Sequence, residues 1–205
     1  RAAARKSKRG FQAPLNCIAC VEAACTLPFD EGMKRERELF NELVTGSQSA
    51  AQRHIFFAER AAAKVDDMPA DVKPLAIRTV GVIGAGTMGG GIAMNFANVG
   101  IPVVLLEMEK AALDRGLAVI RGNYERTAKR GGMSIEQVEQ RMALITPTLD
   151  YAALATVDLV IEAVYENMEV KKTVFTKLDQ VAKPDAILAS NTSTLDVDEI
   201  AAVTK

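Results

Sequence analysis

The sequence is poor in the side chains that build disulfide frameworks and metal centres. Its 205 residues contain no Trp, one His and three Cys, and all three Cys lie between residues 17 and 25. A structural zinc site needs about four ligands, and His54 is the only imidazole available, so we predict neither a metal site nor a disulfide framework. Cys17, Cys20 and Cys25 are instead expected to be small buried residues in a reducing compartment.

Neither sign of charge dominates, and no long apolar run is present. Lys and Arg number 25 against 26 Asp and Glu, which gives no strong field for nucleic acid or an anionic membrane. Residues 1–10 hold five basic side chains without an aromatic residue between them, and this favours a solvated edge over a nucleic-acid patch. The apolar runs are far shorter than the roughly 20 residues of a membrane span. We therefore predict no nucleic-acid partner and no membrane insertion.

The first 65 residues have a helical pattern throughout. Helices are expected over residues 15–26, over residues 30–45 with an apolar stripe, and over residues 47–64. No catalytic pattern accompanies them, because His54 has no Cys, Ser or carboxylate at motif spacing. Two prolines and three acidic residues without periodicity then predict a linker over residues 66–78.

A glycine-rich turn follows the first strand-like run. Residues 79–83 have the apolar pattern of a buried parallel strand, and Gly84, Gly86 and Gly89 come directly after them. In this spacing the first glycine permits a tight turn, the second lets a pyrophosphate approach the backbone, and the third lets the next helix pack closely. The helix N-terminus then presents free N–H groups to the phosphates. No Lys-Ser/Thr pair follows the glycines, which excludes a nucleoside-triphosphate loop.

An acidic residue stands where a dinucleotide site needs one. A second strand is expected over residues 101–106, and Glu107 follows it, 18 residues after Gly89. A carboxylate at this position accepts the hydroxyls of the adenine ribose and repels a 2′-phosphate, which favours NAD over NADP.

Strands and helices alternate in the rest of the chain. This alternation predicts an α/β fold, a Rossmann-type doubly wound parallel sheet preceded by an all-helical segment. Further strands are expected at 143–146, 157–163 and 186–189, and helices at 90–98, 110–129, 134–142 and 170–181.

Polar residues follow two of these strands. Glu166 comes just after residues 157–163, and the segment 190–194 holds Ser190, Asn191, Thr192 and Ser193. Both would face the crevice of the glycine turn. By residue type alone, a turn or helix cap is the favoured interpretation of Asn191, Thr192 and Ser193.

Several blocks in this order resemble a known family. Residues 79–205 resemble the NAD-binding domain of L-3-hydroxyacyl-CoA dehydrogenases through Val-Ile-Gly-Ala-Gly-Thr-Met-Gly at 82–89, Glu-Ala-Val-Tyr-Glu-Asn at 162–167, Val-Lys-Lys at 170–172 and Ser-Asn-Thr-Ser-Thr at 190–194. Residues 29–32, 38–40 and 56–60 look like the end of the crotonase-type hydratase region in multifunctional fatty-acid oxidation enzymes. Residues 1–65 would then be the helical tail of a hydratase domain, joined by the linker to an incomplete dehydrogenase domain.

The resemblance implies roles for particular residues. Met88 would contact the cofactor from the glycine turn, and Glu107 would bind the adenosine ribose. Lys171 would lie near both cofactor and substrate, and Ser193, the one catalytic candidate, would hydrogen-bond the substrate 3-oxygen. Tyr165 departs from the small aliphatic residue common at its position. The implied cofactor-binding set is Gly84, Gly86, Met88, Gly89, Glu107, Val164, Tyr165, Glu166, Lys171, Asn191 and Ser193.

The implied reaction moves a hydride from C3 of a 3-hydroxyacyl-CoA to NAD, while a His backed by a Glu takes the hydroxyl proton. That His is expected beyond Lys205, and the chain opens on Arg1 without Met or an apolar signal region, as a fragment would. We therefore expect these residues to bind NAD without turnover; the alternative is a non-catalytic nucleotide-fold module that serves binding or assembly.

The resemblance also implies an acyl-CoA substrate and, for the parent enzyme, a thiolase subunit or a homo-oligomer as partner. The free cysteines favour the cytoplasm, with the peroxisome as the alternative.

Overall fold

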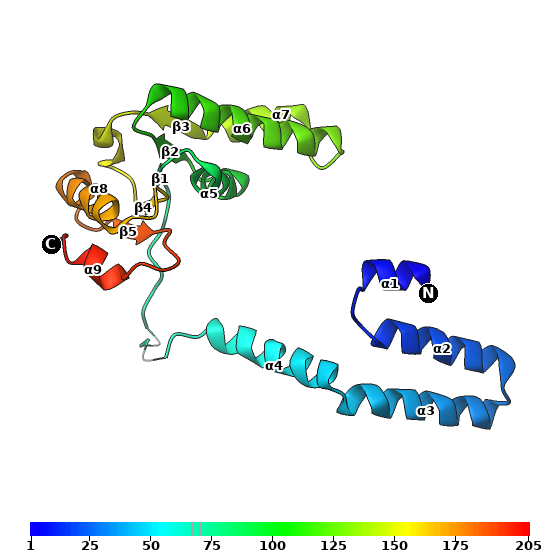
Figure 1. Ribbon diagram of the computed structural model, residues 1–205. Coiled ribbons are helices and arrows are strands. Elements are labelled where there is room, and N and C mark those ends of the chain that lie inside the picture. The colour runs from blue at the N-terminus through cyan, green and yellow to red at the C-terminus, as the bar shows by residue number, and fades with distance from the viewer. Residues whose placement is uncertain (67, 70) are drawn as a thin grey trace. The chain divides into compact units, whose positions relative to one another are not determined.

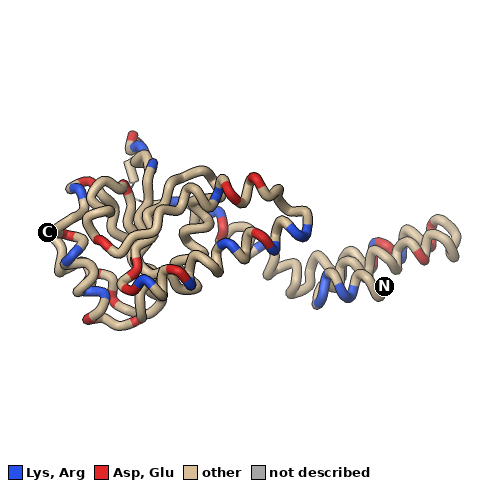
Figure 2. Tube along the Cα trace, turned by 90° about the horizontal axis from the view of Figure 1, so that it is seen from above, with Lys and Arg blue, Asp and Glu red and all other residues tan. Residues whose placement is uncertain are grey.

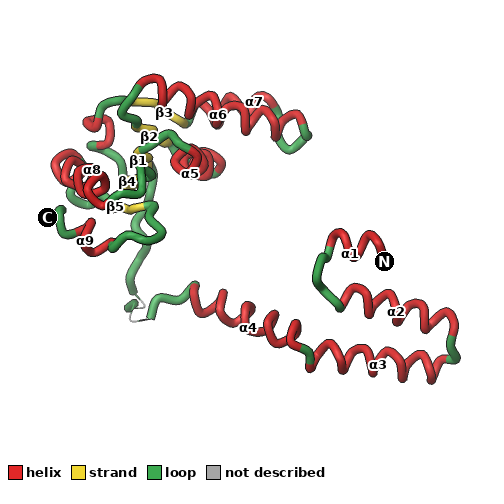
Figure 3. The backbone as a smooth tube through the Cα atoms, viewed as in Figure 1, coloured by secondary structure: helices red, strands yellow, loops and turns green. Residues whose placement is uncertain are grey.

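The computed structural model describes residues 1–66, 68–69 and 71–205. The chain forms two compact units, Arg1–Lys73 and Pro74–Lys205 (Figure 1). Among the described residues, the first unit contains helices and no strands, whereas all the strands belong to the second unit (Figure 3). Positions 67 and 70 of the predicted linker lie outside the described residues.

The first unit is a chain of helices in which sequential neighbours pack together. Its elements are α1 (Ala2–Ser7), α2 (Ala13–Thr26), α3 (Phe29–Thr45) and α4 (Ser47–Ala62). Helix α3 begins one residue before Asp30, and within the described chain no side chain caps α3 or α4. The three predicted helices are therefore present, with starts shifted by at most two residues.

Little of the apolar surface of this first unit is buried. Ala23 and Leu39 are its buried apolar residues among those described, while Phe29 is 80% exposed and Phe40 is 61% exposed. The expectation of buried cysteines is wrong for this unit, because Cys17 and Cys25 are exposed and Cys20 is half-buried; all three are free thiols. The physical reason is that α2 packs on α3 and, among the described residues of this unit, no second layer covers the opposite faces.

The second unit is built on a parallel sheet in the order β3-β2-β1-β4-β5. Each strand has four residues: β1 is Val80–Ile83, β2 is Val103–Leu106, β3 is Ile145–Thr148, β4 is Leu159–Glu162 and β5 is Ile187–Ser190. In register, Ile83 lies beside both Leu106 and Glu162. The predicted α/β class and doubly wound sheet are confirmed. The third strand begins two residues later than predicted, because helix α7 extends through Ala143.

Helices cover both faces of this sheet (Figure 1). One face carries α5 (Thr87–Asn98), α6 (Lys110–Lys129) and α7 (Ile135–Ala143), and the other carries α8 (Met168–Val181) and α9 (Val197–Ala201), with the short 3-10 helix η1 (Tyr151–Leu154) beside α8. A core lies in each layer, one with Val82, Leu105 and Ile120, the other with Ile83, Val160 and Leu178. Strands buried on both faces explain the apolar runs in the sequence.

Charged residues of both signs are mixed along the chain (Figure 2). None of the described helices combines the length and apolar character that a membrane span requires. The described residues also contain no group of three or more His, Cys, Asp or Glu side chains placed to hold a metal ion.

One carboxylate ties the start of the second unit to the sheet. Asp158, just before β4, accepts hydrogen bonds from the backbone N–H groups of Arg78 at 2.6 Å and Thr79 at 3.0 Å. Lys183 approaches the same carboxylate to 2.6 Å. The hydrogen bond from Lys183, followed by those from the two N–H groups, holds the pKa of Asp158 far below its usual range.

We expect Asp158→Asn to lower the melting temperature of the chain at neutral pH by a few degrees, because the N–H groups and Lys183 lose their charged acceptor. A lowered pKa gives stability that is complete above the ordinary Asp pKa of about 3.9, begins to fall below it, and is lost only as the pH falls through the lower pKa of the folded state. The difference in melting temperature from wild type should therefore be smaller at about pH 3 than at neutral pH, without vanishing. Circular dichroism melts at both pH values measure it.

The matched control is Asp185→Asn. This side chain is 78% exposed and faces the same Lys183 at 3.7 Å, so its loss should leave the melting temperature unchanged. Equal losses in the two variants would contradict the assignment to Asp158.

Candidate functional site

The turn between β1 and α5 has the backbone geometry that the glycine spacing predicts. Gly84 has a φ of +99°, a conformation that favours glycine. Its N–H donates to the carbonyl of Leu106 at 2.8 Å, which joins the turn to β2. The chain then enters α5 at Thr87.

The other two glycines of the motif have different reasons for lacking a side chain. A Cβ on Gly89 would lie 1.8 Å from the carbonyl oxygen of Gly84, so α5 can start this close to the turn only with glycine there. A Cβ on Gly86 would meet nothing within 4 Å. The space at Gly86 is open, and in the described chain no side chain caps the N-terminus of α5 beside it. This opening and the uncapped N–H groups suit a phosphate.

Glu107 lies across the turn at the end of β2. One of its oxygens accepts from the N–H of Ala85 at 2.9 Å, and the other accepts from the N–H of Met108 at 2.8 Å. These bonds fix the half-buried carboxylate beside the glycine turn. Each oxygen keeps a further lone pair for a hydroxyl donor.

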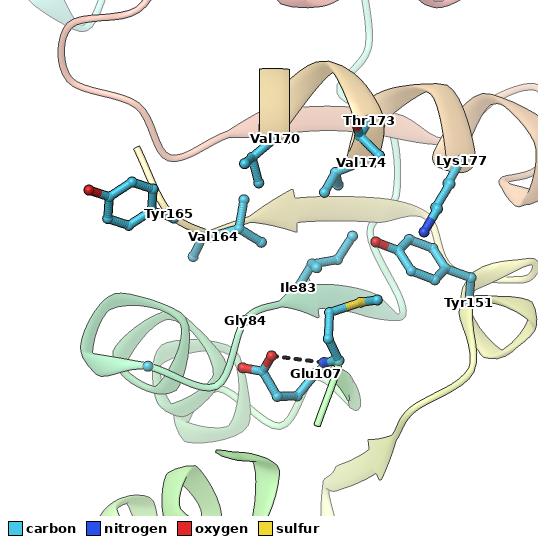
Figure 4. Close-up of a pocket in the computed structure, with 13 residues that line it drawn as sticks. Ile83, Gly84, Glu107, Tyr151, Val164, Tyr165, Val170, Thr173, Val174 and Lys177 are labelled. Atoms are coloured by element: carbon cyan, nitrogen blue, oxygen red, sulfur yellow. Dashed lines mark hydrogen bonds between the residues drawn. The ribbon is translucent and has the colours of Figure 1, made fainter. Parts of the chain in front are cut away.

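A cleft of about 480 Å³ opens between the glycine turn and α8. Glu107 lies on one side, and Val170, Val174 and Lys177 of α8 lie on the opposite side (Figure 4). Met108 also lines the cleft. The cleft lies over the carboxyl ends of β1 and β4, where the strand order reverses, and this is where open α/β sheets bind ligands. Its remaining lining residues are Ile83, Gly84, Gly86, Tyr151, Ala163, Val164, Tyr165 and Thr173.

A polar cluster follows β4 and β5. One oxygen of Glu166 accepts from the hydroxyl of Thr192 at 2.6 Å and from the backbone N–H of Ser193 at 3.2 Å. The hydrogen bond from Thr192, followed by those from Ser193 and Lys171, lowers the pKa of Glu166 to about 2. Glu166, four residues past the end of β4, is therefore bound to the segment after β5 through Thr192 and Ser193.

Behind this cluster lies a buried ion pair. The Lys171 ammonium is 2.6 Å from one oxygen of Glu162 and 3.2 Å from Glu166, and the side chains of Lys171 and Glu162 are 0% exposed. The hydroxyl of Ser190 also donates to Glu162, whose second oxygen accepts from the N–H of Val164 at 3.2 Å. Lys171 consequently lies beneath the site, and its ammonium is held by carboxylates of the protein.

Some of the remaining sequence candidates line the cleft, and the others lie outside it. Gly84, Gly86, Glu107, Val164 and Tyr165 line the cleft. Met88 is 56% exposed on α5 and borders a separate small hollow on that helix, and Gly89 is buried against the turn. The N–H of Asn191 donates to the carbonyl of Glu162 at 2.9 Å, so Asn191 continues the β4–β5 pairing.

Sequence reasoning missed three contributors to this region. Glu162 stands inside an apolar run as the last residue of β4, and an acid in a buried strand nine residues before a Lys was the available signal. Tyr151 and Lys177 line the cleft from η1 and α8, and no local motif marks either of them.

A parallel sheet with a glycine turn at its switch point, an uncapped helix N-terminus and a fixed carboxylate at the end of β2 defines a dinucleotide-binding domain. Residues 79–205 match the family described as 3-hydroxyacyl-CoA dehydrogenase, NAD binding domain, and the chain belongs to that family. NAD is accordingly the cofactor of this domain.

Individual relatives agree with this family. The peroxisomal bifunctional enzyme of Danio rerio is 44% identical over 205 residues, which is 98% of this chain and 28% of the relative. The peroxisomal fatty acid beta-oxidation multifunctional protein MFP2 of Arabidopsis thaliana is 35% identical over 193 residues, or 94% and 27% of the two chains. The structure of 3-hydroxybutyryl-CoA dehydrogenase from Escherichia coli aligns with a TM-score of 0.62 and 40% identity, covering 64% of this chain and 28% of that one.

This chain spans less than a third of the length of these two curated relatives. The alignment with the Danio rerio enzyme covers 98% of the chain, so the likeness includes the helical unit as well as the NAD-binding domain.

Substitutions at Gly86 and Gly89 should have opposite effects on stability and cofactor binding. Gly86→Val should leave the melting temperature nearly unchanged, because a Cβ there meets nothing within 4 Å, yet it should abolish NADH binding by filling the space for the phosphates. Gly89→Ala should lower the melting temperature markedly, because its Cβ would overlap the Gly84 carbonyl. Thermal melts and NADH fluorescence titrations measure both effects, and a Gly86→Val variant that binds NADH normally would refute the phosphate assignment.

Proposed function

We propose that this chain is the part of a multifunctional fatty-acid beta-oxidation enzyme in which a hydratase domain meets an NAD-dependent 3-hydroxyacyl-CoA dehydrogenase. Residues 1–65 are the helical tail of a crotonase-type hydratase domain, residues 66–78 are a linker, and residues 79–205 are the NAD-binding domain. The observation that carries the proposal is one cleft lined by Glu107 beside the glycine turn and by Val164 and Tyr165, the residues that directly precede Glu166.

The cleft favours NAD with its adenosine half near Glu107. A carboxylate held by Ala85 and Met108 accepts the ribose hydroxyls and repels a 2′-phosphate at the same place. Apolar side chains of α8 on the opposite wall, Val170 and Val174, suit a flat base. The open space at Gly86 and the N-terminus of α5 then receive the pyrophosphate.

The nicotinamide half is proposed to lie towards Val164, Tyr165 and Glu166. When bound, NAD supplies the acceptor for the hydride that leaves C3 of the 3-hydroxyacyl-CoA. Ser193 donates or accepts a hydrogen bond at the substrate 3-oxygen, and its position depends on Glu166, which holds its backbone N–H. Lys171 supports Glu166 from beneath.

The same proposal predicts the substrate class, the partner and the compartment of the whole protein. An acyl-CoA is the substrate class, and a thiolase subunit or a second copy of the enzyme is the predicted partner of the whole protein. The relatives from Danio rerio and Arabidopsis thaliana are named peroxisomal, and they give no support to a cytoplasmic location. We therefore propose the peroxisome, which imaging of the full-length protein against a peroxisomal marker would test.

Glu107→Ala is expected to weaken NADH binding by about tenfold or more, because the ribose loses a charged acceptor. The preference for NADH over NADPH should fall in the same variant, since the repulsion of the 2′-phosphate is removed. Fluorescence titration with each cofactor measures both effects. Glu109→Ala is the control, because it removes an exposed acid two residues away and should change neither affinity. Equal NADPH discrimination in wild type and Glu107→Ala would contradict the role of Glu107.

The 205 residues alone should bind NADH and give no turnover with NAD and a 3-hydroxyacyl-CoA. The family reaction needs a His as general base, and the single His of these residues, His54, lies exposed on α4 in the helical unit. NADH production followed by absorbance measures this. A rate comparable to that of a complete dehydrogenase would overturn the expectation, and an absence of NADH binding would favour an assembly module.

A further inference from the structure

Two charged side chains are buried among the described residues, and they bind each other. Glu162 and Lys171 are each 0% exposed, with the ammonium 2.6 Å from the carboxylate. Removing two charges from water is costly, and their attraction offsets this only when further hydrogen bonds satisfy both groups. Glu162 does not line the cleft, so we look for the role of this buried pair in what it holds in place.

Glu162 connects three segments at the edge of the sheet. It ends β4, it accepts from the hydroxyl of Ser190 at the end of β5, and it binds Lys171 near the start of α8. Lys171 is directed to this position because Asn167 caps α8 by accepting from the N–H of Val170 at 3.2 Å. The last residues of two strands and the first turn of a helix are thereby fixed by one carboxylate.

Lys171 links the buried Glu162 to the partly exposed Glu166. Its ammonium is also 3.2 Å from one oxygen of Glu166, whose side chain is 39% exposed. The other oxygen of Glu166 accepts from Thr192 at 2.6 Å and from the N–H of Ser193 at 3.2 Å. A continuous series of polar contacts therefore leads from the buried Glu162 to the turn at residues 192–194.

We infer that Glu162 is a positioning residue, which acts through Lys171 and Glu166 to hold the turn at residues 192–194 in one arrangement before any ligand enters. The importance of this turn for the reaction rests on the proposed function, in which Ser193 contacts the substrate. The competing interpretation is that Lys171 itself contacts cofactor or substrate. The 0% exposure of Lys171 and its two carboxylate partners favour the positioning role.

The charges around Glu166 give this inference a pH signature. The groups around its carboxylate are Lys171 from α8, the hydroxyls of Thr192 and Thr194 after β5, and, on the far side of Lys171, Glu162 at the end of β4. With the pKa of Glu166 lowered to about 2 by Thr192, Ser193 and Lys171, the carboxylate stays ionised at neutral and mildly acidic pH. Without Lys171, Glu162 and Glu166 would be left as like charges, which raises the pKa of Glu166.

The test uses the 205-residue chain without ligand and compares wild type with Glu162→Gln and Lys171→Met. The measurement is the hydrogen-exchange protection factor of the Ser193 amide by NMR, at about pH 7 and about pH 5. Lys172→Met is the matched control, because it removes the same charge from the next residue, which pairs with Glu199.

Wild type and Lys172→Met should show the same protection at both pH values. Lys171→Met should lower the protection by about tenfold, the size expected for the loss of one charge-assisted contact, and lower it further at the acidic pH. Glu162→Gln should lower it severalfold without pH dependence, because Lys171 still compensates Glu166.

Lys171→Met leaves Glu162 buried without a counter-charge, so a melt of each variant accompanies the exchange data. If that variant does not fold, the double variant Glu162→Gln/Lys171→Met carries the test, because it buries no charge and should still show reduced protection at Ser193. Wild-type protection at both pH values in every folded variant of Glu162 and Lys171 would overturn the inference.

NADH titrations of the same samples separate this inference from the proposed function. A wild-type chain that fails to bind NADH would refute the proposed function, whereas the protection data would still decide the role of Glu162. A Lys171→Met variant that loses NADH affinity while Ser193 keeps its protection would show direct contact by Lys171 and would refute the positioning role.

Discussion

The close approach of α5 to the β1 turn is the constraint on which the site depends. A Cβ at Gly89 would lie 1.8 Å from the carbonyl oxygen of Gly84, and a Cβ at Gly116 of α6 would lie 2.4 Å from that of Ala85. Two helices thus press on the backbone of the turn and leave it open only at Gly86. The place where phosphates can approach is therefore set by helix packing on a strand, which also aims the N-terminus of α5 at that place.

The strand order places two acidic residues with different surroundings on either side of β1. Glu107 follows β2 and Glu162 ends β4, and these two strands flank β1 on opposite sides. Because all parallel strands end at one edge of the sheet, both acids lie at that edge, but only Glu107 lines the cleft. Glu107 is fixed by backbone N–H groups near the surface, whereas Glu162 is buried with Lys171 and acts on Glu166. The carboxylate of Glu107 can accept the hydroxyls of a ribose. The pair of Glu162 and Lys171 can instead hold Glu166, and with it the turn at residues 192–194.

The helical unit, residues 1–73, buries far less of its apolar surface than the NAD-binding domain does. Its helices contact their sequential neighbours, and Phe29, Phe40 and Phe57 remain largely exposed. Exposed aromatic side chains of this number are unusual for a domain with a complete core. They agree with the proposal that these helices complete the core of a larger hydratase domain, in a chain that spans less than a third of its curated relatives.

Local pattern and spacing determined much of this protein. Apolar runs, the Gly84-Gly86-Gly89 spacing and Glu107 predicted the sheet, the turn and the choice of NAD, because each depends on nearby residues and on a backbone geometry that few residue types allow. Tertiary structure alone decided the rest. It joined Lys171 to Glu162 and Glu166, brought Tyr151 and Lys177 to the cleft, and left Cys17 exposed. Burial and ion pairing depend on which segments meet across the fold, and spacing along the chain does not record that.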